Sequence, residues 1–169
     1  SDICDMSANV NPLGPMPALV EHLKEHLSAM ASLPEVDAGT MVEAFADYHG
    51  IDPATVTAGN GTTQLIYRIP RALGAQKALV MGPTYADYQD ACAMHAVACE
   101  HLICQETDDF ITDMDAVYRS AASADLVFLC NPNNPTGAMV DKEAIADLCR
   151  ALPETVFVVD ESYLPFAPH

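Results

Sequence analysis

Short apolar runs alternate with stretches of helical periodicity from residue 62 onward. Helical patterns cover residues 62–73 and 84–95. A third begins near residue 113, with Thr112 as its expected cap, and a fourth follows Asp141, its expected cap. Strand-like runs lie at 78–81, 97–103, 126–130 and 156–159. Two of these strand-like runs are apolar throughout rather than alternating with polar residues. Strands covered by helices on both faces have this character. The pattern therefore predicts an α/β fold with a mainly parallel sheet flanked by helices.

The first 60 residues do not follow this alternation. An irregular segment rich in Asn and Pro leads into a helix near Pro17, on which apolar side chains recur at helical spacing at Leu19, Leu23, Leu27 and Met30. A second helix carries Met41, Phe45 and Tyr48 on one stripe. The sequence therefore predicts helices, rather than an alternation of helix and strand, in this part of the chain.

Charge and composition argue against several classes of partner. Lys and Arg total 7 against 24 Asp and Glu, a net charge of -17, whereas nucleic acids and anionic membranes require clustered positive charge. No apolar run approaches the roughly 20 residues of a membrane span, and export is not expected. The six cysteines lack a C-x-x-C pair and lie mostly in apolar stretches, which predicts reduced core residues in a cytoplasmic protein. No metal site is expected, because no ligand set is complete.

Open α/β sheets bind ligands beyond the carboxyl ends of their strands. The glycine-containing turn at residues 59–64 opens a helix, so free N–H groups and the helix dipole would favour a phosphate there. The hydroxyls of Thr62 and Thr63 would be further donors. A bare turn with a helix cap would look the same, and the dinucleotide fingerprint needs a third glycine that this turn lacks.

Two further segments follow apolar strands directly. Residues 131–137 combine two prolines and a glycine with three asparagines, which indicates a fixed turn offering neutral donors, or a purely structural turn. Asp160 ends the last strand, where a carboxylate is costly to desolvate without a cationic partner. A structural salt bridge or a helix cap is the alternative for Asp160. Tyr85 lies at the same rim, where core packing is its plainest interpretation.

Together and in this order, these segments resemble the fold-type I pyridoxal-phosphate (PLP) enzymes, in the group of histidinol-phosphate aminotransferase and threonine-phosphate decarboxylase. The similarity runs from residues 7–15 to residues 160–163, and its most specific parts are the loop at 131–137 and the Asp-x-x-Tyr pair. Residues 7–15 and 65–73 look more like the decarboxylases. The resemblance implies the truncated large, PLP-binding domain of the aspartate-aminotransferase fold in residues 51–169. Residues 1–50 would be an N-terminal segment and helices belonging to the small domain.

The resemblance also implies roles for the rim residues toward pyridoxal 5'-phosphate. Asp160 would pair with the pyridinium nitrogen and keep it protonated, so that the ring can withdraw electrons from the substrate's α-carbon. Asn134 and Tyr163 would bind the ring's phenolic oxygen, and Tyr85 would stack on the ring face. The phosphate would be held by Gly61, Thr62 and Thr63, and the substrate would be covered by a segment containing Asn9, Asn11 and Gly14.

The implied activity is that of an aminotransferase or a decarboxylase acting on a phosphorylated amino acid, in a protein that is a homodimer when complete. The family's Schiff-base lysine follows the Asp-x-x-Tyr pair by some tens of residues, and this sequence stops at His169. Lys24, Lys77 and Lys142 do not match its motif, so we expect the chain alone to be inactive. A non-catalytic module that keeps the fold for ligand sensing or assembly is the alternative, and a dinucleotide-binding domain is a third hypothesis.

Overall fold

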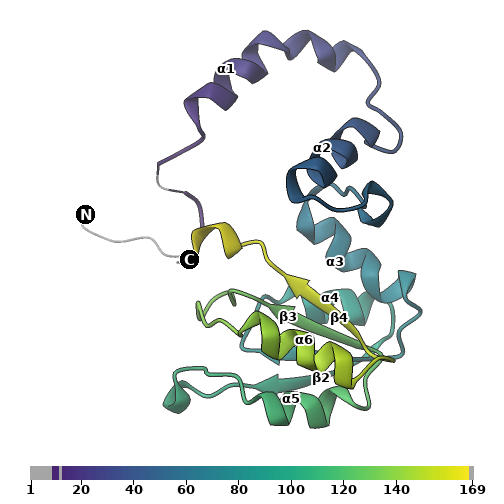
Figure 1. Cartoon of the computed structure of the whole chain (residues 1–169), viewed down its shortest axis with the longest axis vertical. Coiled ribbons are helices and arrows are strands. Elements are labelled where there is room, and N and C mark those ends of the chain that lie inside the picture. The colour runs from purple at the N-terminus through teal and green to yellow at the C-terminus, as the bar shows by residue number, and fades with distance from the viewer. Residues whose placement is uncertain (1–8, 12, 168–169) are drawn as a thin grey trace. The chain divides into compact units, whose positions relative to one another are not determined.

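The computed structural model describes residues 9–11 and 13–167, and it divides into two compact units, Ser1–Ala58 and Gly59–His169. Figure 1 shows the helices of the first unit and the sheet of the second. None of the helices in the described ranges has the length and apolar character that a membrane crossing requires.

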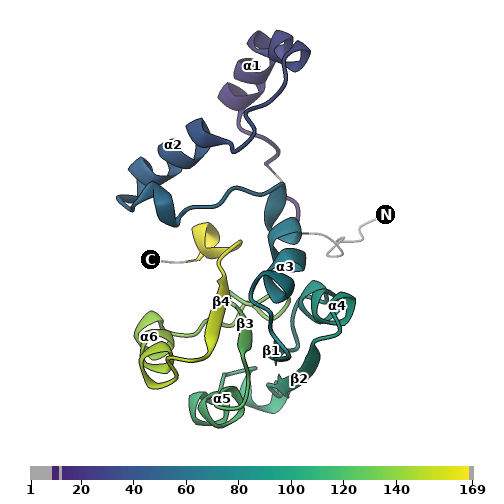
Figure 2. The same ribbon diagram turned by 90° about the vertical axis from the view of Figure 1, so that its right-hand side faces the viewer.

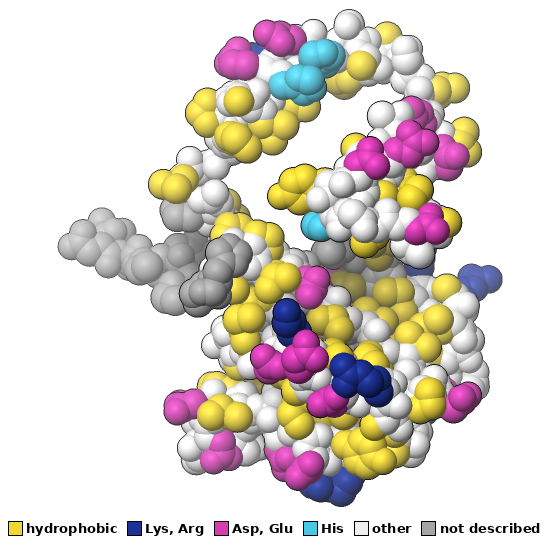
Figure 3. Space-filling model, viewed as in Figure 1, with side chains coloured by type: hydrophobic (Ala, Val, Ile, Leu, Met, Phe, Trp, Pro, Cys, Tyr) yellow, Lys and Arg dark blue, Asp and Glu magenta, His cyan; other side chains and the backbone are white. Residues whose placement is uncertain are grey.

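The first unit is helical, as the spacing of its apolar residues predicts. It contains α1 (Pro17–Glu25), η1 (Leu27–Ala31), α2 (Gly39–His49) and η2 (Pro53–Thr55). Pro17 opens α1, and Gly50 ends α2 at a φ of 65°, a conformation that glycine adopts without strain. Among the described residues of this unit only Ala46 is buried, and apolar side chains lie on its surface (Figure 3).

The second unit is a parallel sheet with helices between its strands, which confirms the predicted fold class. The strands stand in the order β2-β1-β3-β4, and every described pairing is parallel. In chain order the elements are α3 (Gly61–Ala72), β1 (Lys77–Gly82), α4 (Asp87–Met94), β2 (Ala98–Ile103), η3 (Glu106–Asp108), α5 (Met114–Ala121), β3 (Leu126–Cys130), α6 (Lys142–Ala151), β4 (Val156–Asp160) and η4 (Leu164–Phe166).

Helices cover both faces of this sheet (Figure 2). Successive side chains of a strand point to opposite faces, and in β1 Val80 packs into a core with α3 and α4 while Leu79 packs into a core with α5 and α6. In β3, Phe128 packs into the same core as Val80, and Val127 packs into the same core as Leu79. Both faces of these central strands are therefore buried, which is why their sequences are apolar throughout.

Two helix starts differ from the sequence-based expectation. The cap of α5 is Asp113, whose carboxylate accepts the N–H groups of Asp115 and Ala116 at 3.0 and 3.1 Å, rather than Thr112. Helix α4 begins at Asp87 and not at residue 84. Thr84 precedes the helix, and its hydroxyl donates to Asn133 of the neighbouring loop at 2.7 Å. The expected cap of α6, Asp141, is confirmed.

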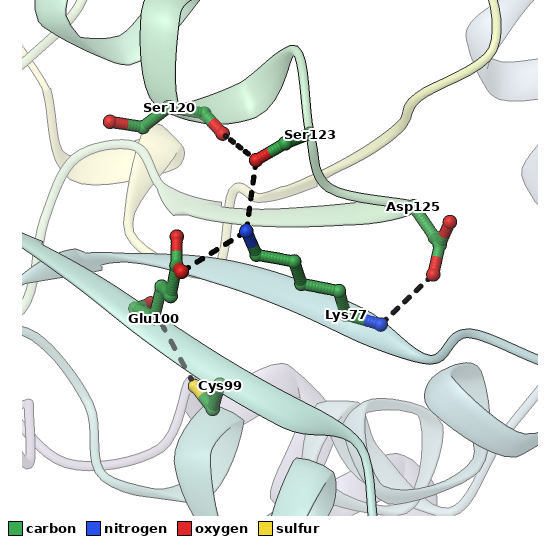
Figure 4. A network of polar contacts seen from close by, with 6 residues as sticks. All are labelled: Lys77, Cys99, Glu100, Ser120, Ser123 and Asp125. Atoms are coloured by element: carbon green, nitrogen blue, oxygen red, sulfur yellow. Dashed lines mark hydrogen bonds and ion pairs between the residues drawn. The ribbon is translucent and has the colours of Figure 1, made fainter.

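Polar contacts join the amino ends of three strands (Figure 4). The Asp125 carboxylate, just before β3, accepts the N–H groups of Gln76 and Lys77 at 2.8 and 2.9 Å. The Lys77 ammonium meets Glu100 of β2 at 3.0 Å and the hydroxyl of Ser123 at 2.9 Å. The start of β1 is thus fixed to both of its neighbours, at the edge of the sheet opposite the strands' carboxyl ends.

Replacing Asp125 with Asn should destabilise the fold in a pH-dependent way. The two backbone hydrogen bonds lower the pKa of Asp125 below its ordinary value of 3.8. Its folded pKa therefore lies below its unfolded pKa, so its stabilisation is present above about pH 4 and is lost as the pH falls through the folded value. Melting temperatures of the two proteins should differ at pH 7 and converge as the pH falls below about 4. Parallel curves across this range would contradict the role of the charge.

Candidate functional site

A cavity opens at the carboxyl ends of β3 and β4, within the second unit. Its volume is ≈ 160 Å³, and its lining brings together residues that are up to about a hundred positions apart in the sequence: Thr62, Tyr85, Tyr88, Cys130, Asn134, Asp160, Ser162 and Tyr163. Five of these, Thr62, Tyr85, Asn134, Asp160 and Tyr163, are residues that the sequence singles out. The fold therefore brings these five residues together at the carboxyl edge of the sheet, where ligands of open α/β folds bind.

Asp160 is the last residue of β4, beside Cys130 of β3. One carboxylate oxygen accepts the hydroxyl of Tyr88 at 2.8 Å. The other accepts the N–H and the hydroxyl of Ser162 at 3.0 and 2.6 Å. All these donors are neutral, and none of the ion pairs within residues 9–11 and 13–167 includes Asp160. A structural salt bridge therefore does not account for Asp160 there, and its carboxylate still faces the cavity.

Tyr85 links this edge to the start of α3. Its side chain is 37% exposed and lines the cavity, while its hydroxyl bonds to the side chains of Asp87 and Thr63. The bond to the Asp87 carboxylate is the main reason that the pKa of Tyr85 is raised above its ordinary value. These contacts hold the ring at the rim, so Tyr85 is not a buried core residue.

Helix α3 presents its amino end to the cavity through Thr62. Among the residues that the structure describes, no side chain caps this end, although the N–H of Asn60 donates to the side chain of Gln64 at 2.8 Å. Gly61 adopts a φ of +79°, where a Cβ would be strained. Gly61 and Thr63 flank Thr62 but are not among the lining residues. Uncapped N–H groups of a 12-residue helix favour an anion at this point.

The loop at residues 131–137 uses its three asparagines differently. Buried Asn131 bonds through its side chain to both the N–H and the carbonyl of Val140, at 2.8 and 3.0 Å. Asn133 donates to the carbonyl of Pro83 at 2.9 Å and to Thr136 at 2.8 Å. Two asparagines are therefore engaged in holding the loop, and Asn134 is the one that lines the cavity.

Two groups of residues are not among those that line this cavity. Asn9, Asn11 and Gly14 belong to the first unit, where Asn11 accepts the N–H of Leu13 at 3.0 Å and Gly14 has a φ of +72°. Their role over a substrate stays a prediction, and residues 7, 8 and 12 of the resembling segment lie outside the described residues. Lysine is absent from the cavity lining, and Lys77 lies at the opposite edge of the sheet.

Three lining residues were not singled out from the sequence: Tyr88, Cys130 and Ser162. Tyr88 follows Tyr85 by three positions, and the two rings meet edge to face with their centroids 5.9 Å apart. Ser162 follows Asp160 by two, the spacing at which an Asp side chain bonds the backbone ahead of it. Both spacings can be read from the sequence, but neither shows that the hydroxyls of Tyr88 and Ser162 bind the Asp160 carboxylate.

The cavity lining contains both a carboxylate, that of Asp160, and a helix start, at Thr62. A carboxylate held by neutral donors suits a cationic heteroaromatic nitrogen, and an uncapped helix start suits a phosphate. Between them lie one aromatic ring from the β1–α4 connection and two neutral hydrogen-bonding side chains, Asn134 and Tyr163. This set of donors and acceptors fits a flat phosphorylated ring with a protonated nitrogen.

Comparisons with known proteins agree with this arrangement. The model of the family "Aminotransferase class I and II" matches residues 1–169. The threonine-phosphate decarboxylase of Salmonella typhimurium is 32% identical over 99% of this chain and 46% of its own length. The histidinol-phosphate aminotransferase of Methanothermobacter thermautotrophicus is 33% identical over 98% of this chain and 45% of its own length.

A solved structure shows the same chain trace. The histidinol-phosphate aminotransferase from Sinorhizobium meliloti, in complex with pyridoxal-5'-phosphate, superposes with a TM-score of 0.87 at 25% identity, over 95% of this chain and 44% of that one. The present chain thus spans about half the length of the relatives and the solved structure that it matches.

Proposed function

The chain belongs to the class I and II aminotransferase family, and from this premise we propose that the complete protein is a PLP-dependent enzyme. The observation that carries the proposal is the shared cavity of Asp160 and Thr62. In this cavity, the Asp160 carboxylate can pair with a ring nitrogen, and the start of α3 at Thr62 can bind a phosphate. Both are needed for a cofactor that is cationic at one end and anionic at the other.

The residues that the sequence singles out around this cavity then have defined tasks toward the cofactor. Asp160 holds a proton on the ring nitrogen, and the start of α3 binds the phosphate through Gly61, Thr62 and Thr63. Asn134 and Tyr163 hydrogen-bond the phenolic oxygen. Tyr85 covers one face of the ring, tethered by its bonds to Asp87 and Thr63. When bound, the cofactor supplies an electron-withdrawing ring that stabilises negative charge at the α-carbon of an amino acid.

The proposed reaction is transamination or decarboxylation of a phosphorylated amino acid. The names of the two relatives, a threonine-phosphate decarboxylase and a histidinol-phosphate aminotransferase, support this substrate class. We place Asn9, Asn11 and Gly14 near the substrate, and we propose a cytoplasmic homodimer for the complete protein.

The complete protein should bind PLP and develop visible absorbance that borohydride reduces irreversibly. The reduced cofactor should then map by mass spectrometry to a lysine beyond residue 169, because Lys24, Lys77 and Lys142 are not in the cavity lining. The 169-residue chain alone should release PLP on dialysis. A complete protein that shows no such absorbance would contradict the cofactor proposal.

A second measurement separates the two reactions and the non-catalytic alternative. Incubation of the holoprotein with O-phosphothreonine releases carbon dioxide if it is a decarboxylase. Histidinol phosphate with 2-oxoglutarate yields glutamate if it is an aminotransferase. A protein that binds PLP without any lysine attachment and turns over neither substrate would instead favour a ligand-sensing or assembly module.

A further inference from the structure

Tyr88 of α4 donates a hydrogen bond to the Asp160 carboxylate. Its side chain is 1% exposed, and its ring is stacked on Phe128 of β3 with centroids 5.1 Å apart and an interplanar angle of 16°. Tyr85 contacts the ring of Tyr88 edge to face. The ring is therefore fixed by packing, so its hydroxyl is held in one position, 2.8 Å from Asp160 Oδ2.

The hydroxyl of Tyr88 keeps its proton and therefore remains a hydrogen-bond donor. Burial first, and then its hydrogen bonds to Cys130 and Asp160, raise the pKa of Tyr88 far above its ordinary value of 10.0. The proton therefore stays on the phenol throughout the physiological range. A buried phenol needs a hydrogen-bond acceptor, and the Asp160 carboxylate supplies one at the inner wall of the cavity.

The two oxygens of Asp160 are held from opposite sides. Ser162, with its N–H and its hydroxyl, binds Oδ1, while Tyr88 binds Oδ2. A carboxylate held at both oxygens cannot rotate freely, so the lone pairs that remain have a set direction. Each donor also withdraws charge from the carboxylate, which makes it a weaker base.

We infer that Tyr88 is a positioning residue, which orients the Asp160 carboxylate and weakens its basicity so that the proton shared with a ring nitrogen stays on the ring. This inference rests on the proposed PLP function and goes beyond it by adding a residue that does not touch the ring nitrogen. Tyr88 acts through Asp160, and its own contacts with Phe128 serve to hold its hydroxyl in place.

Tyr88→Phe in the complete protein is the direct test, because it removes the donor and keeps the ring that stacks on Phe128. We expect the dissociation constant of PLP, measured by titration of the apoprotein, to rise roughly three- to tenfold, as for the loss of one hydrogen bond. With ¹⁵N-labelled PLP, the ring-nitrogen resonance should move toward that of a neutral pyridine. Tyr118→Phe is the matched control, since that tyrosine is 45% exposed on α5.

A double-mutant cycle separates positioning from general structural damage. In an Asp160→Asn background, Tyr88→Phe should change PLP affinity much less than it does in the wild type, because the two residues act as one unit. An equal loss in both backgrounds, or an unchanged affinity and resonance in Tyr88→Phe, overturns the inference. Wild-type protein that binds no PLP would instead refute the proposed function itself.

A second variant keeps the test available if Tyr88→Phe melts below the working temperature. Incorporation of 3-fluorotyrosine at position 88 retains the ring and the hydroxyl and makes the hydroxyl a stronger donor. The ring-nitrogen resonance should then move away from the neutral-pyridine position, opposite in sign to the Phe variant. A shift toward neutral pyridine, or no shift in protein that binds PLP, would contradict the inference.

Discussion

Asp160→Ala should lower the kcat/KM of the complete enzyme about 10²–10³-fold, the scale seen when one preorganised electrostatic contact to developing charge is removed. The carboxylate is the acid in the cavity lining, and without it a ring nitrogen has no anionic partner to keep it protonated. The ring then withdraws electrons poorly, so the barrier for forming negative charge at the α-carbon rises. Steady-state kinetics with the preferred phosphorylated amino acid measures the effect.

The neighbouring carboxylate is the matched control for Asp160. Glu161 is exposed and does not line the cavity, so Glu161→Ala should keep kcat/KM within about twofold, as an exposed side chain outside the site has little influence. Circular dichroism should show both variants folded. Turnover by Asp160→Ala at the wild-type rate would refute the role of this carboxylate.

Phe128→Ala should destabilise the sheet unit by about 3–5 kcal/mol, the usual cost of removing a large buried aromatic ring. Phe128 is 1% exposed at the centre of β3, in the core formed with α3 and α4. The substitution also removes the surface on which Tyr88 is stacked. The void has rigid strands on one side, so little of it can close. Urea denaturation of the protein, followed by circular dichroism, measures the change.

Phe166→Ala is the control for the predicted loss of stability in Phe128→Ala. Phe166 lies in η4 and is 73% exposed, so Phe166→Ala should change the free energy of unfolding by less than about 0.5 kcal/mol. If the two variants unfold at the same urea concentration, the core around β3 is not the main source of stability in this unit.

Much of the fold was predictable because local and global signals agree in the second unit. The runs that became β1 and β3 are apolar throughout, and both of their faces are buried, so composition and topology point to the same answer. The boundaries were less predictable. Thr112 and Asp113 can both cap a helix, and only the placed chain shows that Asp113 does so.

The candidate site was predictable where a residue's type carried the chemistry. A carboxylate at a strand end needs a partner and a glycine turn before a helix can bind an anion, and Asp160 and Thr62 do share a cavity. Tyr88 was missed because an aromatic residue on a helix is most often part of a core, and its hydroxyl's partner is 72 positions away. Likewise, no local pattern distinguishes Asn134 from Asn131 and Asn133, whose side chains hold the loop.

Strand β4 forms one border of the sheet, next to β3 only. Its sequence, Val-Phe-Val-Val-Asp, is strongly β-forming, and its outer row of N–H and C=O groups has no strand beside it among the described residues. Such a border is a template for any strand that can reach it. Recombinant production of these 169 residues by themselves therefore calls for conditions that limit self-association, such as low protein concentration or a solubilising fusion partner.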